Sequence, residues 1–287
     1  MSAPHLAFST AELRAQVARW RQAGDSVALA PTMGALHEGH LSLVRIAQKR
    51  ASKTIVSVFV NPTQFAPGED FAAYPRTFES DLEKLSAVGA DLIFRPVVEE
   101  VYPPGFATSV AVGGPAAAGL EDKFRPSHFA GVATIVTKLL LLARPDVAVF
   151  GEKDYQQLAV IRRLVCDLDI ESEIVGAPIF REPDGLAMSS RNVYLTHVER
   201  ESAPVLHREL KRAAALIMDA GDIGHAMAQA RQTIAKAGFA LDYFELRNAE
   251  TLAPIDDATK EGRLLVAARI GRTRLIDNLA LTLKDRR

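Results

Sequence analysis

The sequence predicts an α/β fold, in which a doubly wound parallel sheet is followed by a smaller α+β domain. Short apolar runs such as Val27–Ala30 alternate with segments of helical spacing, which is the pattern of parallel strands joined by helices. Toward the C-terminus the pattern changes, because two helical segments are followed by residues 241–246 and 264–270, which alternate like strands of a small antiparallel sheet. We therefore expect two domains, over residues 1–177 and 178–287.

Composition and charge are those of an ordinary globular protein with small-molecule partners. The chain has 287 residues, enough for one large domain or two smaller ones with a well-buried core. Hydrophobic residues make up 48% and charged residues 24%, as in soluble proteins. Lysine and arginine number 34 against 35 acidic residues, so no net field attracts nucleic acid or an anionic membrane. We expect neither as a partner.

The expected location is the cytoplasm. The single cysteine, Cys166, cannot form an internal disulfide, and its helical context predicts a buried side chain in a reducing compartment. The N-terminal segment carries Glu12, Arg14 and Arg19 in a helical pattern and has no signal-peptide core. No apolar run reaches the roughly 18 residues of a membrane span. The most apolar segment, residues 132–143, is interrupted by polar side chains and predicts a buried helix.

In the first domain, the elements can be placed in order. Ser9–Glu12 is a capping box that starts a helix ending by Gly24. Strands are expected over residues 27–30, 55–60, 91–94, 147–150 and 170–175, and helices from about residue 37 to 49, over 77–88, through 132–143 and after 154. Residues 67–75 are expected to form a loop. The glycine- and proline-rich segment 101–126 is longer than an ordinary connection between two elements of a compact domain. It therefore predicts a lid or a subunit contact.

The second domain begins near Pro178. Arg181–Gly185 has the Pro-Asp-Gly composition of a turn. Thr196 and Glu199 form a capping box for a helix expected to run to about Ala220, and a further helix is expected to end at Gly238. The two strand-like segments named above complete an α+β domain.

The segment Pro31–His40, with the sequence PTMGALHEGH, lies at a strand-to-helix turn. A helix that begins near His37 points unpaired N–H groups and the positive end of its dipole at whatever sits above the turn, which suits a phosphate. Turns of this kind are where open α/β sheets bind ligands. The segment therefore predicts a nucleotide site.

Two familiar motifs nearly fit this segment, and both fail. Gly34 and Gly39 have Walker A spacing, but His40 stands where that motif needs lysine and Leu41 where it needs a hydroxyl. The zinc motif HExxH is one residue longer, and no third ligand follows. What remains is H-x-G-H, in which glycine lets the backbone approach a ligand and two imidazoles donate to phosphate oxygens. The alternative is that the histidines only cap and pack the turn.

Three other polar segments follow predicted strands or lie in loops. Asn61–Phe65 follows the second strand of the parallel sheet, at the same edge as the histidines. Gly151–Gln157 follows the fourth, where Lys153 could meet a phosphate and Asp154 a ribose or a cation, although a solvated first helical turn would look the same. Met188–Asn192 places two serines beside an arginine, a compact but common anion clamp.

Taken together, these motifs resemble one known family. PTMGALHEGH, FVNPTQF, RPSHFAGVATIVTKL, GEKDYQQL and REPDGLAMSSRN resemble the pantothenate synthetases, or pantoate:β-alanine ligases. The match runs from about Val27 through Leu195 and, more loosely, to the C-terminus. The resemblance implies an adenylate-forming ligase of the nucleotidyltransferase superfamily with a Rossmann-like first domain. It also implies a smaller C-terminal domain that closes over ATP, a Mg²⁺ requirement and a homodimer.

The resemblance also assigns roles to individual residues. It implies that His37, His40 and Lys153 are catalytic, with His40 as a protonated imidazole. It implies that Gln64 and Gln157 hold the organic substrates, between apolar walls from Met33 and Phe65. No residue is assigned as a metal ligand. The ATP site would comprise Met33, Gly34, Ala35, Leu36, His37, Glu38, Gly39, His40, Gly151, Glu152, Lys153, Asp154, Phe180, Met188, Ser189, Ser190 and Arg191.

The implied reaction has two steps. The carboxylate of pantoate attacks the α-phosphorus of ATP to give pantoyl adenylate and pyrophosphate, and the amine of β-alanine then displaces AMP. Such chemistry needs positioning and stabilisation of phosphoryl charge. Two residues depart from the family pattern: Ser127 stands where glycine is more usual, and Phe180 is bulkier than expected near the adenine.

Two other functions fit part of the pattern. A nucleotidyltransferase acting on a phosphorylated substrate also uses H-x-G-H, but its substrate would call for basic groups in place of Gln64 and Gln157. An ATP-binding protein without catalysis is the second alternative. Such a protein would not need His37, His40, Lys153 and Arg191 at the place where negative charge develops during a reaction.

Overall fold

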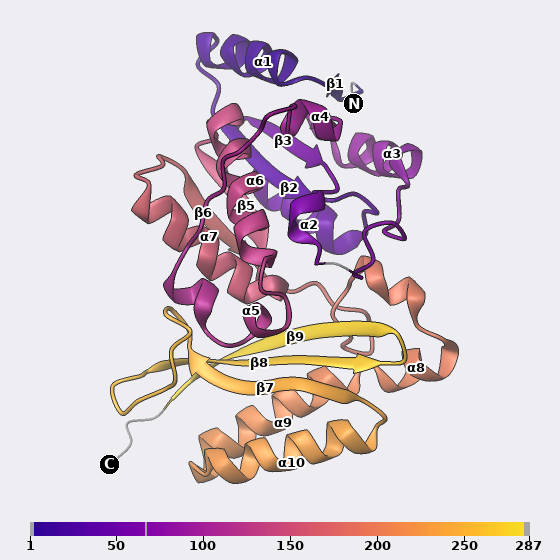
Figure 1. The fold of residues 1–287 in the computed structure, drawn as a ribbon, viewed down its shortest axis with the longest axis vertical. Coiled ribbons are helices and arrows are strands. Elements are labelled where there is room, and N and C mark those ends of the chain that lie inside the picture. The colour runs from indigo at the N-terminus through magenta and orange to yellow at the C-terminus, as the bar shows by residue number, and fades with distance from the viewer. Residues whose placement is uncertain (1–2, 67, 284–287) are drawn as a thin grey trace.

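The computed structural model describes residues 3–66 and 68–283, which form two sheets (Figure 1). The first is a six-stranded parallel sheet in the order β1-β4-β3-β2-β5-β6, and the second is a three-stranded antiparallel sheet in the order β7-β8-β9. The strands are β1 His5–Ala7, β2 Val27–Thr32, β3 Lys53–Val58, β4 Leu92–Phe94, β5 Val147–Gly151, β6 Glu173–Ala177, β7 Ala240–Asn248, β8 Glu261–Ile270 and β9 Thr273–Thr282.

Helices connect these strands and flank both sheets. The α-helices are α1 Thr10–Gln22, α2 Glu38–Gln48, α3 Phe78–Val88, α4 Val98–Val101, α5 Glu121–Phe124, α6 His128–Ala143, α7 Tyr155–Asp167, α8 His197–Ser202, α9 Val205–Ala220 and α10 Ile223–Lys236. The 3₁₀ turns are η1 Pro62–Gln64, η2 Gly114–Ala117, η3 Glu152–Asp154 and η4 Ser190–Tyr194. The expected α/β class is therefore confirmed.

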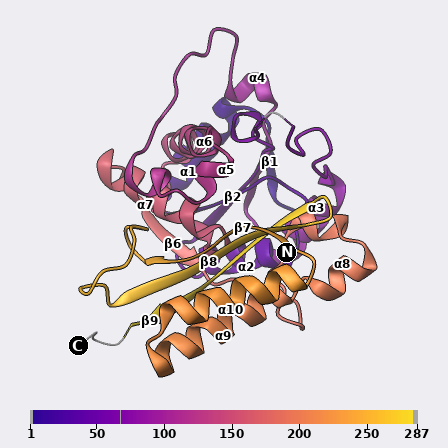
Figure 2. The ribbon, with the colours of Figure 1, turned by 60° about the horizontal axis from the view of Figure 1, so that its bottom comes forward.

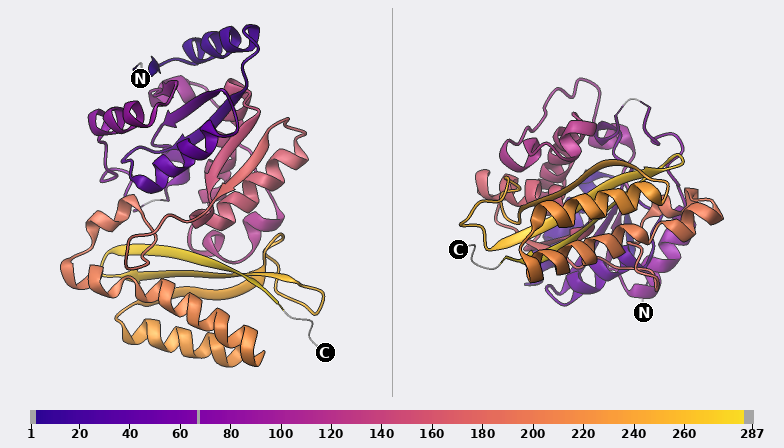
Figure 3. Two further views of the ribbon diagram at one scale, coloured as in Figure 1. Left: turned by 180° about the vertical axis from the view of Figure 1, so that it is seen from behind. Right: turned by 90° about the horizontal axis from the view of Figure 1, so that it is seen from below.

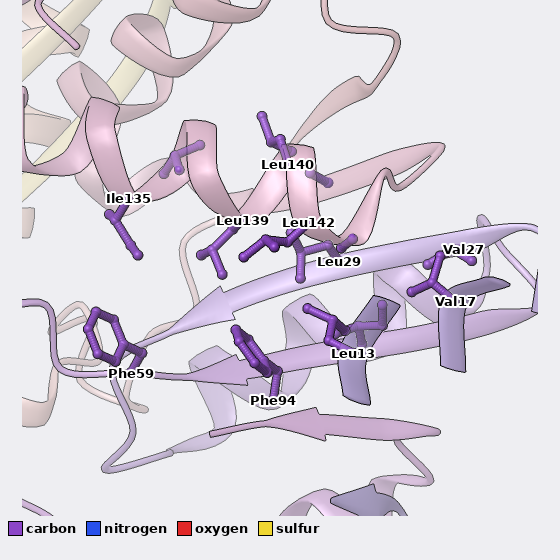
Figure 4. Packing of buried hydrophobic residues seen from close by; sticks show 14 of the residues in the cluster. Leu13, Val17, Val27, Leu29, Phe59, Phe94, Ile135, Leu139, Leu140 and Leu142 are labelled. Carbon is purple, nitrogen blue, oxygen red and sulfur yellow. The ribbon is translucent and has the colours of Figure 1, made fainter. Parts of the chain in front are cut away.

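The first sheet is covered on both faces, as a doubly wound sheet requires. Apolar residues of α1, α6 and α7 pack on one face, and those of α2 and α3 pack on the other. Figure 4 shows the first of these cores, where Leu139 and Leu142 of α6 face Leu29 of β2. Successive residues of β2 alternate between the two cores, with Leu29 on one face and Ala28 and Ala30 on the other. Burial on both faces explains why the strand is continuously apolar.

The strand order places the ligand-binding edge of the sheet. The chain winds outward from β2 toward β3 and β4 in one direction and from β5 to β6 in the other, so β2 and β5 are the pair at which the order reverses. In open α/β sheets, ligands bind beyond the carboxyl ends of the strands at such a point. The turns that follow β2, β3 and β5 lie at this edge, because all three strands are parallel neighbours.

The second sheet lies between the first domain and a helical pair. Helices α9 and α10 pack side by side on its outer face, as Figures 2 and 3 show from below. Its inner face meets the first domain through Tyr243, Leu265 and Ala267, which cluster with Tyr155 and Leu120. The antiparallel sheet therefore contacts the helical pair with its outer face and the first domain with its inner face.

Several sequence-based expectations need correction. The helix expected from Thr196 to about Ala220 is broken into α8 and α9, because Pro204 has no N–H to donate and its ring would clash with a preceding carbonyl. Cys166 is exposed on α7 instead of buried. Strands β1 and β9 were not anticipated, and β3 and β6 are shifted by two or three residues from the expected ranges. Pro67, in the expected loop, lies outside the described residues.

The long irregular segment 101–126 contacts the second domain. It contains η2 and α5, and the buried Glu121 of α5 accepts hydrogen bonds from Tyr243 Oη at 2.8 Å and from both terminal nitrogens of Arg274. The nearby Gln156 side chain holds the same segment by accepting from Glu121 N and donating to Pro115 O. Within residues 3–66 and 68–283, no helix is long and apolar enough to cross a membrane.

Two adjacent leucines of α6 test how the first core is built. Leu140 is 1% exposed, whereas Leu141 points outward and is 60% exposed. We expect Leu140→Ala to lower the free energy of unfolding by about 2–5 kcal/mol, through lost burial and the cavity left behind. Leu141→Ala is the matched control and should change it by less than about 0.5 kcal/mol. Urea unfolding followed by circular dichroism measures both, and equal effects would contradict this assignment of the core face.

Candidate active site

The polar segments expected from the sequence meet around one pocket of about 220 Å³. Its walls come from the turns after β2, β3 and β5 and from Met188–Arg191 of the second domain. The floor is apolar and is formed mainly by α6, through residues such as Ile135 and Leu139. The pocket therefore combines a polar rim at the sheet edge with an apolar base.

The two histidines of H-x-G-H stack at the start of α2. His37 is the N-cap residue of the helix, and its ring centroid lies 4.0 Å from that of His40. The backbone N–H of His37 donates to His40 Nδ1 at 3.3 Å. Because Nδ1 of His40 accepts this bond, its proton belongs on Nε2. His37 Nδ1 is buried and has no hydrogen-bond partner among the described residues.

Gly39 is required by the position of the His37 ring. A Cβ atom at residue 39 would lie 2.9 Å from both Cε1 and Nδ1 of His37. Such an approach is closer than carbon atoms tolerate, so any larger residue would displace the imidazole. The glycine thus lets the first histidine fold back over the helix terminus, which explains the spacing of the motif.

Burial keeps both imidazoles neutral. Burial is the main cause, and together with the nearby positive charge of Lys153 it lowers the pKa of His37 to about 4 and that of His40 to about 3. At neutral pH, His40 therefore presents a neutral Nε2–H donor. The protonated imidazole expected from the family resemblance is not what the protein itself provides.

The loop that carries the histidines is fixed from α3 and from the second domain. Asp81, 1% exposed, accepts hydrogen bonds from Ala35 N at 2.9 Å and Leu36 N at 2.8 Å. Lys84 Nζ donates to Leu36 O at 2.7 Å, and Ser190 Oγ donates to Ala35 O at 3.1 Å. These bonds hold Ala35 at a positive φ of 51°, an uncommon conformation for a residue with a Cβ.

Beside the histidines, an amide pair occupies the part of the pocket over α6. Asn61 Nδ2 donates to Gln64 Oε1 at 3.0 Å, and Gln64 Nε2 lies 3.1 Å from the weakly accepting sulfur of Met33. The turn that carries both amides sits directly on α6, because a Cβ atom at Gly131 would come within 2.3 Å of Thr63 O. Gly131 therefore sets how deeply Gln64 reaches into the pocket.

Arg125 and His128 complete this side of the pocket. His128 Nδ1 lies 2.9 Å from Gln64 O, so it carries the proton, and its Nε2 accepts from Arg125 Nη1 at 3.2 Å. Burial, together with the adjacent guanidinium of Arg125, lowers the pKa of His128 to about 4. Arg125 is held by Glu69, which accepts from its Nε at 2.6 Å and its Nη2 at 2.9 Å. The cation is thus rigid and partly neutralised.

The turn after β5 contributes Gly151, Lys153, Asp154 and Gln157 to the pocket lining. Lys153 Nζ lies 3.7 Å from Asp154, and the lysine side chain is 20% exposed. Gln157 faces the pocket, whereas the adjacent Gln156 is buried under segment 101–126. The two glutamines of the DYQQ sequence therefore have different surroundings.

Arg191 reaches across from the second domain and pairs with Asp70 of the first. Its Nε donates to Asp70 Oδ2 at 2.9 Å and its Nη2 to Asp70 Oδ1 at 2.8 Å, a bidentate pair. Nearby, Tyr194 Oη donates to Ala73 O at 3.0 Å. The Met188–Arg191 loop is therefore docked against the first domain, with Ser189 and Ser190 on the pocket wall.

Most residues proposed from the sequence line this pocket, but some do not. Met33, His37, Gly39, His40, Gln64, Gly151, Lys153, Asp154, Gln157, Phe180, Met188, Ser189, Ser190 and Arg191 line it, and so does Phe65. Five others lie outside the lining. Gly34 and Ala35 shape the loop, Leu36 is 3% exposed in the core, Glu38 pairs with Arg45 and Glu152 with Arg263.

Sequence reasoning missed Asn61, Tyr74, Arg125 and His128 in the lining. Asn61, Arg125 and His128 belong to quoted motifs, so their presence in those motifs was the available signal. Ser127 adopts an ordinary right-handed φ of −91°, so its backbone does not need glycine. Phe180 is 39% exposed at the pocket mouth, where it packs near Gly39.

The fold and this pocket define a two-domain α/β protein with a polar pocket at the carboxyl edge of its parallel sheet, and comparison with known proteins names its family. Residues 5–280 match the family model described as pantoate-beta-alanine ligase, and the chain belongs to this family of ligases. A pantothenate synthetase of Rhodopseudomonas palustris (strain HaA2) is 56% identical over 280 residues, which cover 97% of this chain and 99% of the relative.

Solved structures give the same result. A pantothenate synthetase from Thermus thermophilus is 47% identical with a TM-score of 0.91, over 96% of this chain and 98% of that one. A pantoate-beta-alanine ligase from Francisella tularensis, complexed with beta-gamma ATP and beta-alanine, is 32% identical with a TM-score of 0.83, over 96% and 97% of the two chains. The arrangement of a parallel sheet and a smaller antiparallel domain is thus that of the family.

The buried histidines predict a specific dependence of stability on pH. Their folded-state pKa values of about 3 to 4 lie below the ordinary value of 6.5, so between these limits the unfolded chain binds protons that the folded protein does not. The contribution of these histidines to stability is therefore fully present above pH 6.5 and is lost as pH falls toward their folded-state pKa values. Each imidazole contributes a slope of at most about 1.4 kcal/mol per pH unit.

The test compares His40→Asn with His197→Asn, because the His197 side chain is 88% exposed. Unfolding free energies are measured in urea from about pH 7 to about pH 4.5, within the window in which the unfolded imidazole gains its proton. We expect the slope to decrease in His40→Asn and to stay at the wild-type value in His197→Asn. An unchanged slope in His40→Asn would show that the imidazole is not held neutral.

Proposed function

We propose that this protein condenses pantoate with β-alanine through a pantoyl-adenylate intermediate, consuming ATP and releasing AMP and pyrophosphate. The observation that carries the proposal is one pocket in which hydrogen-bond donors from both domains, suited to an anion, face an amide pair over an apolar floor. Family membership and the ATP and β-alanine ligands of the Francisella tularensis relative support it. Each part of the pocket corresponds to one part of the reaction.

ATP would occupy the rim formed by H-x-G-H, Gly151–Asp154 and Met188–Arg191. The N-terminus of α2 and the His37 and His40 rings would face the phosphates, and Ser189, Ser190 and Arg191 would approach them from the second domain. Gly151 and Asp154 would lie on the ribose side, and Phe180 would cover the base. The bidentate pair with Asp70 leaves Nη1 of Arg191 available for a phosphate oxygen.

Pantoate would occupy the part of the pocket over α6. Gln64 and Gln157 offer neutral donors and acceptors for its hydroxyls and carboxylate, with Asn61 orienting Gln64. Met33, Phe65 and the apolar floor suit the two methyl groups on the pantoate backbone. If the carboxylate of pantoate accepts a hydrogen bond from Gln64 Nε2, it displaces only the weak contact between that nitrogen and the Met33 sulfur. Little bonding within the protein would therefore be lost on binding.

In the first step, charge moves onto the phosphoryl oxygens as the carboxylate of pantoate attacks the α-phosphorus. His40 Nε2–H and Lys153 Nζ are preorganised donors in a largely buried site, where such donors are most effective. A bound triphosphate adds negative charge beside the rings and raises their pKa, so proton donation to departing pyrophosphate becomes easier. The amine of β-alanine then attacks the acyl carbon of the mixed anhydride, and AMP leaves.

Magnesium fits this site as a companion of the nucleotide. Among the residues that the structure describes, no cluster of three or more His, Cys, Asp or Glu side chains is arranged to hold a metal ion. Asp154 is the carboxylate in the pocket lining, and Mg²⁺ usually keeps few protein ligands beside substrate phosphates. Bound with the nucleotide, Mg²⁺ would neutralise phosphate charge and would be held mainly by the phosphates and water.

We also propose that residues 1–177 bind ATP and pantoate, that residues 178–287 act as the closing domain, and that the enzyme works as a cytoplasmic homodimer. The docking of the Met188–Arg191 loop on the first domain supports the division of labour. A nucleotidyltransferase for a phosphorylated substrate is disfavoured, because Gln64 and Gln157 stand where such a substrate would call for basic groups, and the nearby Arg125 is already paired with Glu69. A binding protein without catalysis would not need the neutral, buried His40.

The reaction is tested by isotope exchange. We expect labelled pyrophosphate to enter ATP only when pantoate is present, and pantothenate to form when β-alanine is added, because adenylate formation is reversible and precedes amide formation. The control is the same assay with a phosphorylated acid in place of pantoate. Exchange with that acid but not with pantoate would reject the substrate assignment.

The role of His40 is tested by single-turnover kinetics. We expect His40→Ala to slow adenylate formation on the order of 10²-fold, as removal of one donor to developing charge does. Pantoate binding, measured by calorimetry, should change far less. His225→Ala, on an exposed position of α10, is the control and should retain the wild-type rate. A wild-type rate in His40→Ala would remove this residue from the mechanism.

A further inference from the structure

The turn that carries Lys153 belongs to the first domain, but its backbone is held by the second. Asn278 of β9 is 2% exposed, and its Nδ2 donates to Glu152 O at 2.8 Å and to Lys153 O at 2.9 Å. Both amide hydrogens are therefore used on consecutive carbonyls of η3. The side chain of Asn278 in the antiparallel sheet thus fixes the backbone of Lys153.

Asn278 is itself held from two sides. Its Oδ1 accepts from Arg263 Nε at 2.8 Å, and its backbone N–H donates to Asp277 Oδ1 at 2.7 Å. Since Oδ1 must accept from the guanidinium, the amide cannot be flipped, and Nδ2 must face the two carbonyls. Every donor and acceptor group of the side chain has a partner, so its position is strongly determined.

The same arginine reinforces the clamp. Arg263, 7% exposed, donates from Nη2 to Glu152 Oε2 at 2.9 Å, and its guanidinium carbon lies 3.9 Å from the centre of the Tyr155 ring. Glu152 was expected at the nucleotide, but its carboxylate is occupied by this pair. The residue before Lys153 and the first residue of α7 are therefore both in contact with the second domain.

We propose that Asn278 is a positioning residue for catalysis, which orients Lys153 toward the phosphates only while the two domains are docked. The proposal rests on the proposed function, because it assigns Lys153 to the adenylate-forming step. Its physical basis is that the lysine has a long, flexible side chain, so its reach is set by where its peptide is fixed. Small misplacements of a catalytic group reduce rates strongly.

The first test is single-turnover adenylate formation in Asn278→Ala. We expect the rate to fall about 10- to 100-fold, while the KM for pantoate changes less than about 3-fold, because the pantoate pocket is built without Asn278. The matched control is Tyr243→Phe, which removes another buried contact between the domains, the bond to Glu121, and touches neither Glu152 nor Lys153. This variant should keep the wild-type rate, and an equal loss in both variants would overturn the proposal.

A double-mutant cycle separates positioning from general structure. If Asn278 acts through Lys153, then Asn278→Ala should cause no further loss of rate in a Lys153→Ala background. A merely structural role would give the same fold-loss in both backgrounds and would overturn the proposal. Asn278→Ser, which keeps one donor, should give an intermediate rate and serves for the cycle if Asn278→Ala does not fold.

Failure of the positioning role can be distinguished from failure of the proposed function. If the wild-type enzyme shows no pantoate-dependent exchange, the function is wrong and the positioning role is rejected with it. If the wild-type enzyme is active and Asn278→Ala, folded by circular dichroism, forms adenylate at the wild-type rate, the function stands and the positioning role alone is rejected.

Discussion

Burial of the parallel sheet on both faces is the constraint on which the rest of this structure depends. Strands with helices on either side must be apolar along their length, so polar groups can gather only where the strands end. Because β2, β3 and β5 are parallel neighbours, their polar turns meet at one edge. The N-terminus of α2 opens at the same edge and adds unpaired N–H groups. The position of the pocket is therefore a consequence of how the core is covered.

Within that pocket, burial determines the chemical state of the side chains. Desolvation lowers the pKa of His37 and His40 and so favours uncharged rings, while Lys153 and Arg191 add positively charged side chains to the pocket lining. Asp81 and Lys84 fix the loop that carries the rings. In the proposed reaction the hydrogen-bond donors of these side chains would be in place before charge develops, so adenylyl transfer would need little reorganisation.

The second domain contributes to both sides of the site. It supplies Ser190 and Arg191 to the rim, and it holds the backbone beside Lys153 through Asn278. These contacts come from segments far apart in the chain, a loop at the start of the domain and the last strand of its sheet. In this structure the charged rim is therefore assembled from both domains, and its geometry depends on the contacts between them.

The sequence by itself determined the α/β class, the turns at the strand ends and most of the pocket lining, because hydrophobic periodicity and short motifs are local signals. It also indicated the family through motifs that are specific only in combination. Tertiary structure alone decided which of two adjacent glutamines faces the pocket, that Glu152 pairs with Arg263 and that Asn278 clamps Lys153. These choices depend on contacts between distant segments, and no local pattern encodes which partner a buried polar group will find.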